Sequence, residues 1–433
     1  MRFDPQQLRI DGVYAQRQPG TFMLRIKVPA GILSAEQAEA VADIADRFAG
    51  GLLHLTTRGS IELHGLTEDH LPSVWRGLAA VGLTTRGACG GAVRGVVCGS
   101  VTAAAWPLVQ SLAHKLHLHF TRNPHFEALP KKFKIGVFTG DNEGRHLIQD
   151  LSLVHRENEA DAPRYDVWAA GGLGREPSPA FLVEEAVAED RIIPLVEAIV
   201  RVYKERAPKG KRLKHLVRDL GREKFLALVA ERRGDQPLPL ADFFSGELFP
   251  SVAAGGACVE APVFAGELTT GGLRALAAVA RDVAGGFMVL TGDQNVRFLL
   301  PEGGRRQDAL DAVAAAGFAA DRPEQRVAFR ICPGSHECAM GLAPTRDVAR
   351  AIIGAMGDDA AALRWSISGC PNSCSQPQLA RVGIVTAKSV KGEDGQRRPL
   401  FDLYRREDDG SLGGVVGSGL ELEELVAAVR LER

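Results

Sequence analysis

Four cysteines in the C-terminal quarter of the chain have the spacing of a metal or cluster site. They lie in two close pairs, Cys332 with Cys338 and Cys370 with Cys374. Iron–sulfur clusters take thiolate ligands, four to a cubane, and the Pro and Gly residues beside each pair favour turns that let the backbone wrap a bulky group. If the chain between the pairs folds back, the four thiols can therefore converge on one iron–sulfur cluster.

Three other interpretations of these cysteines remain open at this point. Zinc accepts four thiolates, but its structural pairs usually stand two to four residues apart, and Cys332 and Cys338 have five residues between them. Two disulfides would need an oxidising compartment, and the N-terminus lacks the apolar core of a secretory signal. The third interpretation is unrelated buried cysteines, which would leave this arrangement of four among seven without a purpose.

The cysteine pattern resembles the cluster motif of the siroheme-containing sulfite and nitrite reductases. The matching residues are Cys332-x5-Cys338 followed by Gly369-Cys370-Pro-Asn-x-Cys374. The resemblance implies that Cys332, Cys338, Cys370 and Cys374 hold a [4Fe–4S] cluster. It also implies that Cys374 is the ligand shared with the siroheme iron.

Four basic residues match the substrate-binding positions of that family. Arg25 follows Met23-Leu24 and precedes a Pro-Ala-Gly turn, Arg94 ends a Cys-Gly-x-x-x-Arg loop, and Lys132 and Lys134 lie in Leu-Pro-Lys-Lys-Phe-Lys. The resemblance implies that the arginines bind the oxyanion and that the lysines deliver protons. Residues two apart on a strand share a face, so both lysines can point into one pocket.

Three further residues match family contacts to siroheme. Arg58 lies in a Leu-Thr-Thr-Arg-Gly segment, and Gln294 and Asn295 lie in the corresponding segment of the second half. The chain departs from the family at Glu62, where glutamine is common, and at Gly95, where asparagine is usual. These departures affect the expected carboxylate contacts more than the expected cofactors.

The composition is that of a globular protein without a nucleic-acid or membrane partner. The 433 residues carry a formal net charge of -1, 24% charged residues and 45% hydrophobic residues. No basic excess points to nucleic acid, and no run of about 18 apolar residues predicts a membrane span. We therefore expect a cytoplasmic protein.

An internal repeat predicts that the chain consists of two similar halves. A shift of 235 residues brings Ala30-Gly31 onto Ala265-Gly266, the helix cap Ser34 onto Thr269, and Ala49-Gly-Gly onto Ala284-Gly-Gly. A weaker similarity relates residues 165–168 to 401–404 and residues 134–137 to 381–384. A shared cap, helix stop and strand in one register indicate duplication.

The repeat and the resemblance together predict an α+β fold with pseudo-two-fold symmetry. We expect ferredoxin-like half-modules at residues 1–80 and 246–322, and larger α/β modules for siroheme and the cluster at residues 81–245 and 323–433.

Local patterns predict several elements within these modules. Strands are expected at 22–28 and 52–63 on either side of a helix that Ser34 caps, helical structure over 180–231, and a helix after Pro344. The basic run at 209–215 is expected to be a solvated face.

The predicted activity is the siroheme-dependent reduction of sulfite to sulfide. Nitrite reduction to ammonia uses the same cofactors and is the alternative; the presence of Lys134, where nitrite-specialised members often have asparagine, favours sulfite. A precorrin-3B synthase-type hydroxylase and a non-catalytic cluster protein are less favoured, because neither needs these cations.

The glycines at 171–174 lack the spacing of a dinucleotide site, so electrons must come from a separate ferredoxin or flavoprotein.

Overall fold

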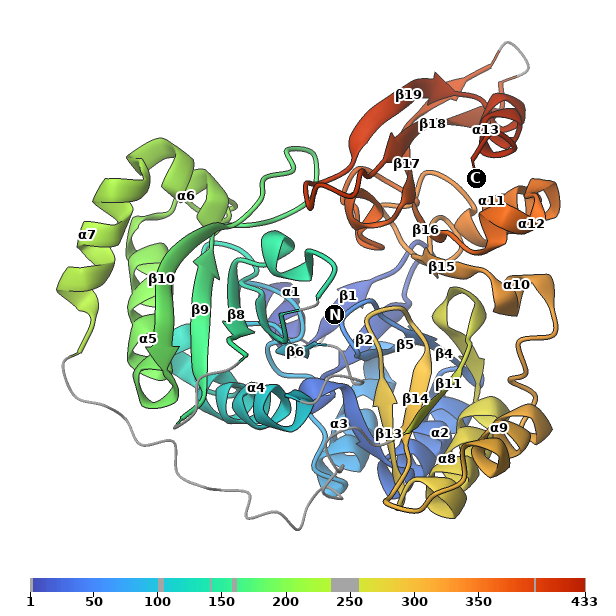
Figure 1. Cartoon of the computed structure of the whole chain (residues 1–433), viewed down its shortest axis with the longest axis horizontal. Helices are drawn as coiled ribbons and strands as arrows, with labels where there is room; N and C mark the ends of the chain where they lie inside the picture. The colour runs from blue at the N-terminus through green and yellow to red at the C-terminus, as the bar shows by residue number, and fades with distance from the viewer. Residues whose placement is uncertain are drawn as a thin grey trace.

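The chain was analysed as a computed structural model, which describes residues 3–99, 105–140, 142–157, 162–234, 257–392 and 395–432. The described residues form four sheets with helices packed on them (Figure 1). Two small modules, blue and yellow in the figure, lie side by side, and each half of the chain adds one larger module, green or red. The predicted boundary at residues 245 and 246 lies outside the described residues.

The first small module is built on an amphipathic helix whose start the sequence predicts correctly. Ser34 Oγ accepts a hydrogen bond from the Gln37 amide at 3.1 Å, and Gln37 Oε1 accepts one from the Ser34 amide, also at 3.1 Å, which completes a capping box. The elements are α1 (Pro5–Ile10), β1 (Val13–Ala15), β2 (Phe22–Ile26), η1 (Pro29–Gly31), α2 (Ala35–Phe48), β4 (Leu52–Leu55), β5 (Ile61–Leu66), η2 (Glu68–His70) and α3 (Leu71–Ala80).

One strand prediction for this module is wrong in its extent. Residues 52–63 form two antiparallel strands, β4 and β5, because the chain reverses at residues 56–60. The Thr56 amide donates to the Ser60 carbonyl at 2.9 Å, and Gly59 adopts φ +58°. Alternation of apolar residues continues on both sides of this turn, so periodicity alone did not show it.

The second small module repeats the first. Its elements are β11 (Cys258–Ala261), η5 (Phe264–Gly266), α8 (Thr270–Val283), β13 (Phe287–Leu290), β14 (Val296–Leu299) and α9 (Arg306–Ala315). Thr269 caps α8 by accepting from the Gly272 amide at 3.0 Å. The helices α2 and α8 pack on each other, and apolar residues of both modules form one core.

The two small modules exchange a strand. β3 (Ile32–Ser34) of the first module pairs with β13 of the second, and β12 (Glu267–Thr269) of the second pairs with β4 of the first. The resulting strand orders are β1-β2-β5-β4-β12 and β11-β14-β13-β3. The predicted duplication is thus confirmed, and each sheet needs both halves of the chain.

The first large module is a mixed sheet in the order β10-β9-β8-β7-β6, with β6, β7 and β8 parallel. Its elements are β6 (Val97–Cys98), α4 (Trp106–Phe120), η3 (Pro124–Phe126), β7 (Ile135–Phe138), η4 (Arg145–Ile148), β8 (Leu151–His155), β9 (Arg164–Ala169), β10 (Phe181–Ala188), α5 (Glu189–Arg206), α6 (Leu213–Leu220) and α7 (Arg222–Arg232). The predicted helical stretch from 180 is wrong up to residue 188, because residues 181–188 form β10 and pair with β9 instead.

The basic run at 209–215 is the solvated face that we expected only at Lys209 and Lys211, which are exposed. Arg212 and Lys214 are only 5% and 8% exposed. Arg212 Nη2 lies 2.8 Å from Oδ2 of Asp150, a fully buried carboxylate, and the other oxygen of Asp150 accepts from Arg212 Nε at 3.1 Å. A buried guanidinium needs such a partner, and the partner lies 62 residues away in the sequence.

The second large module has the same sheet topology. Its strand order is β15-β16-β17-β18-β19, with the first three strands parallel and the last two antiparallel to their neighbours. The elements are α10 (Pro323–Arg326), β15 (Ala328–Ile331), α11 (Thr345–Ala355), α12 (Asp358–Ala361), β16 (Arg364–Ser368), η6 (Pro377–Leu379), β17 (Val382–Lys391), β18 (Arg397–Arg405), β19 (Gly414–Leu420) and α13 (Leu422–Val429). The helix predicted after Pro344 is α11, whose aliphatic residues are buried.

Of the two weak sequence similarities, one joins equivalent strands of the two large sheets and the other does not. β9 and β18 are both fourth in order of appearance in their sheets, as the similarity of 165–168 to 401–404 predicts. The other similarity is wrong: residues 135–138 form β7, the second strand, whereas 382–391 form β17, the third. A short apolar segment containing one glycine matched by composition alone.

Among the residues that the structure describes, no helix combines the length and the apolar character that crossing a membrane requires.

The strand exchange predicts that glycine is required at Gly31. Gly31 has φ +78°, and an added Cβ would collide with the Leu290 carbonyl oxygen. Gly31→Ala should therefore lower the free energy of unfolding by about 3 kcal/mol, from a left-handed backbone plus a steric clash. Gly50→Ala is the matched control, because Gly50 has φ +66° but open space around it, and it should lose only about 1 kcal/mol. Equal shifts of the thermal midpoint in both variants would contradict the role of the close approach.

Candidate functional site

A deep pocket with positively charged walls lies where the small modules meet both large ones, and we call it the anion pocket. It has an open volume of about 990 Å³. Its lining includes Arg25, Lys27, His54, Arg58, Glu62, Arg94, Lys132, Lys134, Gln294, Cys332 and Cys374. The residues come from widely separated stretches of the sequence, so only the folded chain creates this concentration of charge.

All four predicted substrate-binding residues line the anion pocket. Arg25 lies on β2, Arg94 on the loop before β6, and Lys132 and Lys134 just before β7. Lys134 is held by its backbone, because its amide donates to Asp150 Oδ2 at 2.9 Å. The pair of Asp150 and Arg212 therefore anchors the segment that carries both lysines.

The two arginines differ from the lysines in that protein groups already occupy their donors. Arg25 donates from Nε and Nη2 to Glu62 Oε1, at 2.9 and 2.5 Å. Arg94 donates from Nη2 to the Gly90 carbonyl at 2.9 Å. Burial lowers the pKa of Arg25, but Cys89 and Glu62 more than offset it, so this guanidinium stays charged. The arginines thus contribute fixed positive charge.

The lysines are the titratable cations of the pocket. Burial lowers the pKa of Lys134 well below its ordinary value, and the neighbouring charges of Lys132 and Arg58 lower it further. Burial also lowers the pKa of Lys132, with Cys374 opposing this effect. The expected mutual repulsion is therefore present at Lys134, but burial is the larger cause. A lowered pKa makes each ammonium group a stronger acid and so a better proton donor.

Lys27 is a cation of the pocket that sequence reasoning missed. Its side chain is 2% exposed, and Nζ donates to Thr121 Oγ1 at 2.8 Å. Burial lowers its pKa to about 7, with Arg94 as the next cause. A signal was available in the sequence: Lys27 follows Arg25 by two residues, as Lys134 follows Lys132, and this spacing on a strand gives a shared face.

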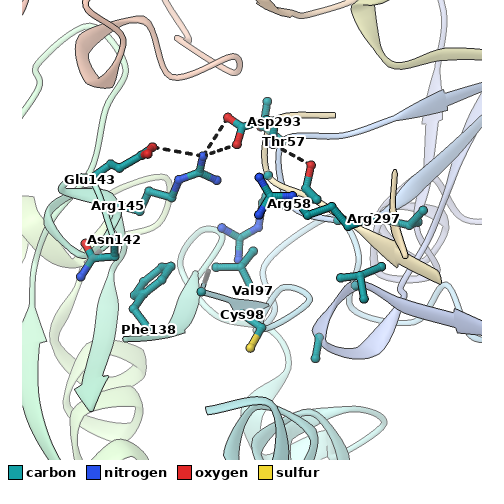
Figure 2. Close-up of a pocket in the computed structure, with 18 of the residues that line it drawn as sticks. Thr57, Arg58, Val97, Cys98, Phe138, Asn142, Glu143, Arg145, Asp293 and Arg297 are labelled. Carbon is teal, nitrogen blue, oxygen red and sulfur yellow. Dashed lines mark hydrogen bonds and ion pairs between the residues drawn. The ribbon is translucent and has the colours of Figure 1, made fainter. Parts of the chain in front are cut away.

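A second cavity adjoins the anion pocket, and the two share Thr57 and Arg58 in their walls. We call it the arginine pocket, because four arginines line its open volume of about 1130 Å³. These are Arg58, Arg145, Arg297 and Arg364. In Figure 2, Arg58 lies between the group of Arg145 and Asp293 on one side and Arg297 on the other.

The arginine pocket also holds acidic groups that pair with its cations. Arg145 Nη2 lies 2.8 Å from both carboxylate oxygens of Asp293, and Glu143 is 3.7 Å away on the other side (Figure 2). Arg330, 4% exposed, also faces Asp293, at 3.4 Å. Burial raises the pKa of Asp293, but Arg145 and Arg330 overcome it and lower the pKa overall.

Arg58 lies at the junction of the pockets, as a residue expected to hold a tetrapyrrole carboxylate should. Its Nη1 donates to Gln149 Oε1 at 2.8 Å and its Nη2 to the Gly95 carbonyl at 2.7 Å. Burial lowers its pKa to about 9, and Arg94 is the next cause. Gly95 thus contributes through its carbonyl, which does not require the asparagine usual at this position.

Gln294 and Asn295 have protein partners in place of free amide groups. Gln294 Nε2 donates to the carbonyls of Leu55 and Ile331, both at 2.9 Å, and Oε1 accepts from the Ile331 amide at 2.7 Å. Asn295 bonds to Val263 and Glu260 and is not among the residues lining either pocket. The structure therefore brings Gln294 to the anion pocket as a structural bridge and does not bring Asn295 there.

The four predicted cluster cysteines lie on neighbouring loops of the second large module. Cys332 follows β15, and its Sγ accepts a hydrogen bond from the Gly369 amide at 3.1 Å, which joins the two cysteine loops. Burial raises the pKa of Cys332, with the thiol of Cys374 as the next cause, and raises that of Cys370 to about 11. Burial raises the pKa of Cys338, and the charge of Cys374 also raises it. The four thiols are thus close enough to influence one another's ionisation.

The cysteine loops meet the anion pocket on one side. Cys332 and Cys374 line the anion pocket, whereas Cys338 and Cys370 do not. The cluster loops therefore present one side to the cations.

The turn that carries Arg58 is attached to the Cys374 loop. Thr57 Oγ1 donates to the Cys374 carbonyl at 2.9 Å, and Gln376 Nε2 donates to the Thr57 carbonyl at 3.2 Å. These bonds join residues more than 300 positions apart. A large polyanionic cofactor would find arginines on one side here and a cysteine thiol on the other, so the residues present fit siroheme.

Comparison with protein families matches most of the chain. The nitrite and sulphite reductase 4Fe-4S domain matches residues 87–237, and the nitrite/sulfite reductase ferredoxin-like half domain matches residues 14–81 and again 253–316. The half domain thus occurs twice, as the repeat predicts. The matched part of the 4Fe-4S domain is the first large module, and the four cysteines lie outside it.

Individual relatives include both activities. The chain is 30% identical to a ferredoxin–nitrite reductase of Synechococcus elongatus, covering 94% of the chain and 82% of the relative. It is 25% identical to sulfite reductase [ferredoxin] 2 of Mycolicibacterium paratuberculosis, covering 95% and 80%. The identity is 26% to a sulfite reductase [NADPH] hemoprotein beta-component of Acidithiobacillus ferrooxidans, covering 99% and 83%.

The fold matches a solved structure over nearly its whole length. The NirA protein of Mycobacterium tuberculosis superposes with a TM-score of 0.82 at 22% identity, covering 98% of this chain and 85% of that one. The predicted α+β duplicated fold is confirmed.

The convergence of the thiols predicts the effect of replacing them. Cys374→Ser and Cys332→Ser should each lose most of the cluster iron and acid-labile sulfide, because a serine oxygen is a poor ligand for this soft site. Cys258→Ser is the control: Cys258 begins β11, and its variant should keep the iron content of the parent. Iron and sulfide analysis of the purified proteins checks this. Full iron in both loop variants would show that these cysteines do not hold the cluster.

Proposed function

Because this chain belongs to the nitrite and sulphite reductase family, we propose that it is a cytoplasmic enzyme that reduces sulfite to sulfide with electrons from a separate donor protein. The observation that carries the proposal is the convergence of Arg25, Arg94, Lys132 and Lys134 with Cys374 on one pocket. Sulfite is a small oxyanion, and a buried anion requires paired positive groups.

A [4Fe–4S] cluster and siroheme are the cofactors of this chain, as of its family. When bound, they would pass the six electrons of the reduction from the donor protein to the substrate. We assign Cys332, Cys338, Cys370 and Cys374 to the cluster, with Cys374 also facing the siroheme iron. Arg58 and the other arginines of the arginine pocket are the groups with charge to hold siroheme carboxylates.

The residues of the anion pocket would perform binding and protonation. Arg25 and Arg94 are fixed by their protein partners and hold a positive potential that attracts and polarises the oxyanion. Lys132 and Lys134, with lowered pKa values, donate protons as the oxygens leave as water. Lys27 adds a third titratable ammonium group beside them.

Nitrite reduction to ammonia is the second candidate, and one observation favours it. The relative from Synechococcus elongatus, at 30% identity, is a nitrite reductase. The donor is a ferredoxin or a flavoprotein, since relatives are named for ferredoxin and for NADPH. Steady-state assays of the holoenzyme on both oxyanions with a reduced artificial donor separate the candidates: sulfide as the faster product supports the proposal, ammonium as the faster product supports nitrite, and neither product refutes both.

The charge and proton roles of Lys134 can be separated by substitution. Lys134→Arg keeps a positive charge that cannot be released in the working pH range. It should keep KM within about threefold of the parent and lower kcat by ~100-fold, the loss expected for a general acid. Lys134→Met should raise KM as well. Lys131→Met is the matched control, because Lys131 is exposed on the same segment, and it should behave like the parent.

Proton donation by Lys134 also predicts the direction in which kcat/KM changes with pH. Because the folded pKa of Lys134 is lowered, its proton is present at acidic pH and is lost as pH rises through that pKa. The kcat/KM of the parent should therefore fall as pH rises, and this fall should weaken in Lys134→Arg. A kcat unchanged in Lys134→Arg would refute proton donation by this residue.

A further inference from the structure

A third cavity lies behind the anion pocket, and we call it the outer pocket. Its open volume is about 780 Å³. Its lining includes Gln16, Gln18, Thr21, Leu52, His54, His64, Glu267, His336, Glu337 and Arg346. Leu52 and Gln18 are exposed, so this cavity reaches the protein surface. His54 lines both the outer pocket and the anion pocket and is therefore part of the wall between them.

His64 connects the outer pocket to Glu62, a carboxylate of the anion pocket. Gln16 Nε2, which can only donate, lies 3.1 Å from His64 Nδ1. This contact assigns the proton of the neutral ring to Nε2. His64 Nε2 lies 3.7 Å from Glu62 Oε2 and has no hydrogen bond in the described part of the chain. The ring therefore directs a buried N–H toward the carboxylate without quite reaching it.

His54 has the same unusual feature on the other side of Glu62. Its Nε2 faces Gln294 Nε2, an amide donor, at 3.3 Å, which assigns the ring proton to Nδ1. That Nδ1 is buried and has no hydrogen-bond partner among the described residues. Buried polar groups are normally satisfied by protein or by ordered water. Two such ring nitrogens at one cavity wall indicate a place where water or a proton is exchanged.

Burial keeps both of these rings neutral near pH 7. The groups facing them are Arg25, Glu62, Glu267, His336, Glu337 and Arg346. Burial lowers the pKa of His54 to about 4 and also lowers that of His64, although Glu62 opposes both shifts. Burial raises the pKa of Glu62, but Arg25 overcomes this effect and the pKa is held at about 2, so Glu62 is ionised. A neutral imidazole can accept a proton at one nitrogen and donate from the other, as a relay requires.

We propose that His64 and Glu62 relay protons from water in the outer pocket to the oxyanion in the anion pocket, and that His54, in the wall between the two pockets, assists them. This inference rests on the proposed function, but it holds for sulfite and nitrite alike, because both reductions consume protons. Each transfer moves one proton. His64 accepts one from water at Nδ1, where the Gln16 contact breaks, and releases the Nε2 proton to Glu62, which passes it to a substrate oxygen, where an O–H bond forms. A flip of the His64 ring then restores the starting tautomer and the Gln16 contact. A small rotation of the His64 ring, or one water, closes the 3.7 Å gap.

Glutamate at position 62 is essential to this relay. Glu62 is 5% exposed and lines the anion pocket. Its Oε2 lies 3.7 Å from His64 Nε2. A glutamine there would still accept a hydrogen bond from Arg25, but its amide cannot take up and release a proton at this position. The difference between the two side chains therefore isolates proton transfer from the positioning of Arg25.

The test compares single variants of the holoenzyme on whichever oxyanion the parent reduces. Glu62→Gln and His64→Gln should each lower kcat by about tenfold while changing KM little. The loss should grow with pH, because hydronium then has to replace the relay, and the solvent isotope effect on kcat should rise above that of the parent. His54→Gln tests the second histidine in the same way. His125→Gln, an exposed histidine, should match the parent.

Rescue separates a relay from a structural role. His64→Gly should regain kcat when imidazole is added, with the regained rate following the fraction of neutral imidazole. Histidine C2 hydrogen exchange, measured by mass spectrometry, should show a lower pKa for His64 in Glu62→Gln, because the carboxylate that raises it is gone. This second readout does not depend on turnover.

The outcomes also distinguish the relay from the proposed function. If the parent turns over and all three variants keep its kcat, pH profile and isotope effect, the relay is refuted and the enzyme remains a reductase. Variants that lose kcat with unchanged pH profile and no imidazole rescue also refute it. If the parent reduces neither oxyanion, the proposed function fails instead, and the His64 exchange measurement still reports on the coupling to Glu62.

Discussion

The close approach of two backbones at the pseudo-two-fold axis is the constraint on which the rest of the structure depends. Gly31 lies against the Leu290 carbonyl, and Gly266, its counterpart 235 residues later, lies against the Leu55 carbonyl. Both contacts use residues with positive φ, which glycine adopts without strain. Only this proximity lets β3 and β12 cross into the opposite sheets. Because each small sheet then contains strands from both halves, neither half can complete its sheet alone.

The same axis positions the two turns that reach into the cofactor pockets. The turns at 56–60 and 291–295 have matching backbone hydrogen bonds, from Thr56 to Ser60 and from Thr291 to Asn295, each 2.9 Å. The duplicated positions have diverged in charge: Arg58 lies at one tip and Asp293 at the other. Arg58 faces the first large module, whereas Asp293 binds a cation from each large module, Arg145 and Arg330. A symmetric scaffold thus carries an asymmetric arrangement of charges.

Burial gives the anion pocket its chemical character. The guanidinium groups stay charged because carboxylates and carbonyl oxygens saturate them, and they therefore act as fixed charges. The ammonium groups of Lys27 and Lys134 have few such partners, so desolvation lowers their pKa values toward the range in which protons are exchanged. One pocket thus contains cations that hold an anion and cations that release protons. The division follows from the number of protein acceptors around each group.

The sequence by itself determined the features that depend on residue type and short spacing. These include the cap at Ser34, the repeat at 235 residues, the four cysteines and, through the family resemblance, the four basic residues of the anion pocket, because each of these signals is a short motif that can be recognised without knowing the fold. Tertiary structure alone decided the strand exchange, the burial of Arg212 on Asp150, and the use of the Gln294 amide as a bridge between backbones. Each of these is a contact between residues far apart in the chain, where local pattern carries no information. The pairing of Arg25 with Glu62, which fixes one charge and connects the pocket to two histidines, also exists only once the strands β2 and β5 align.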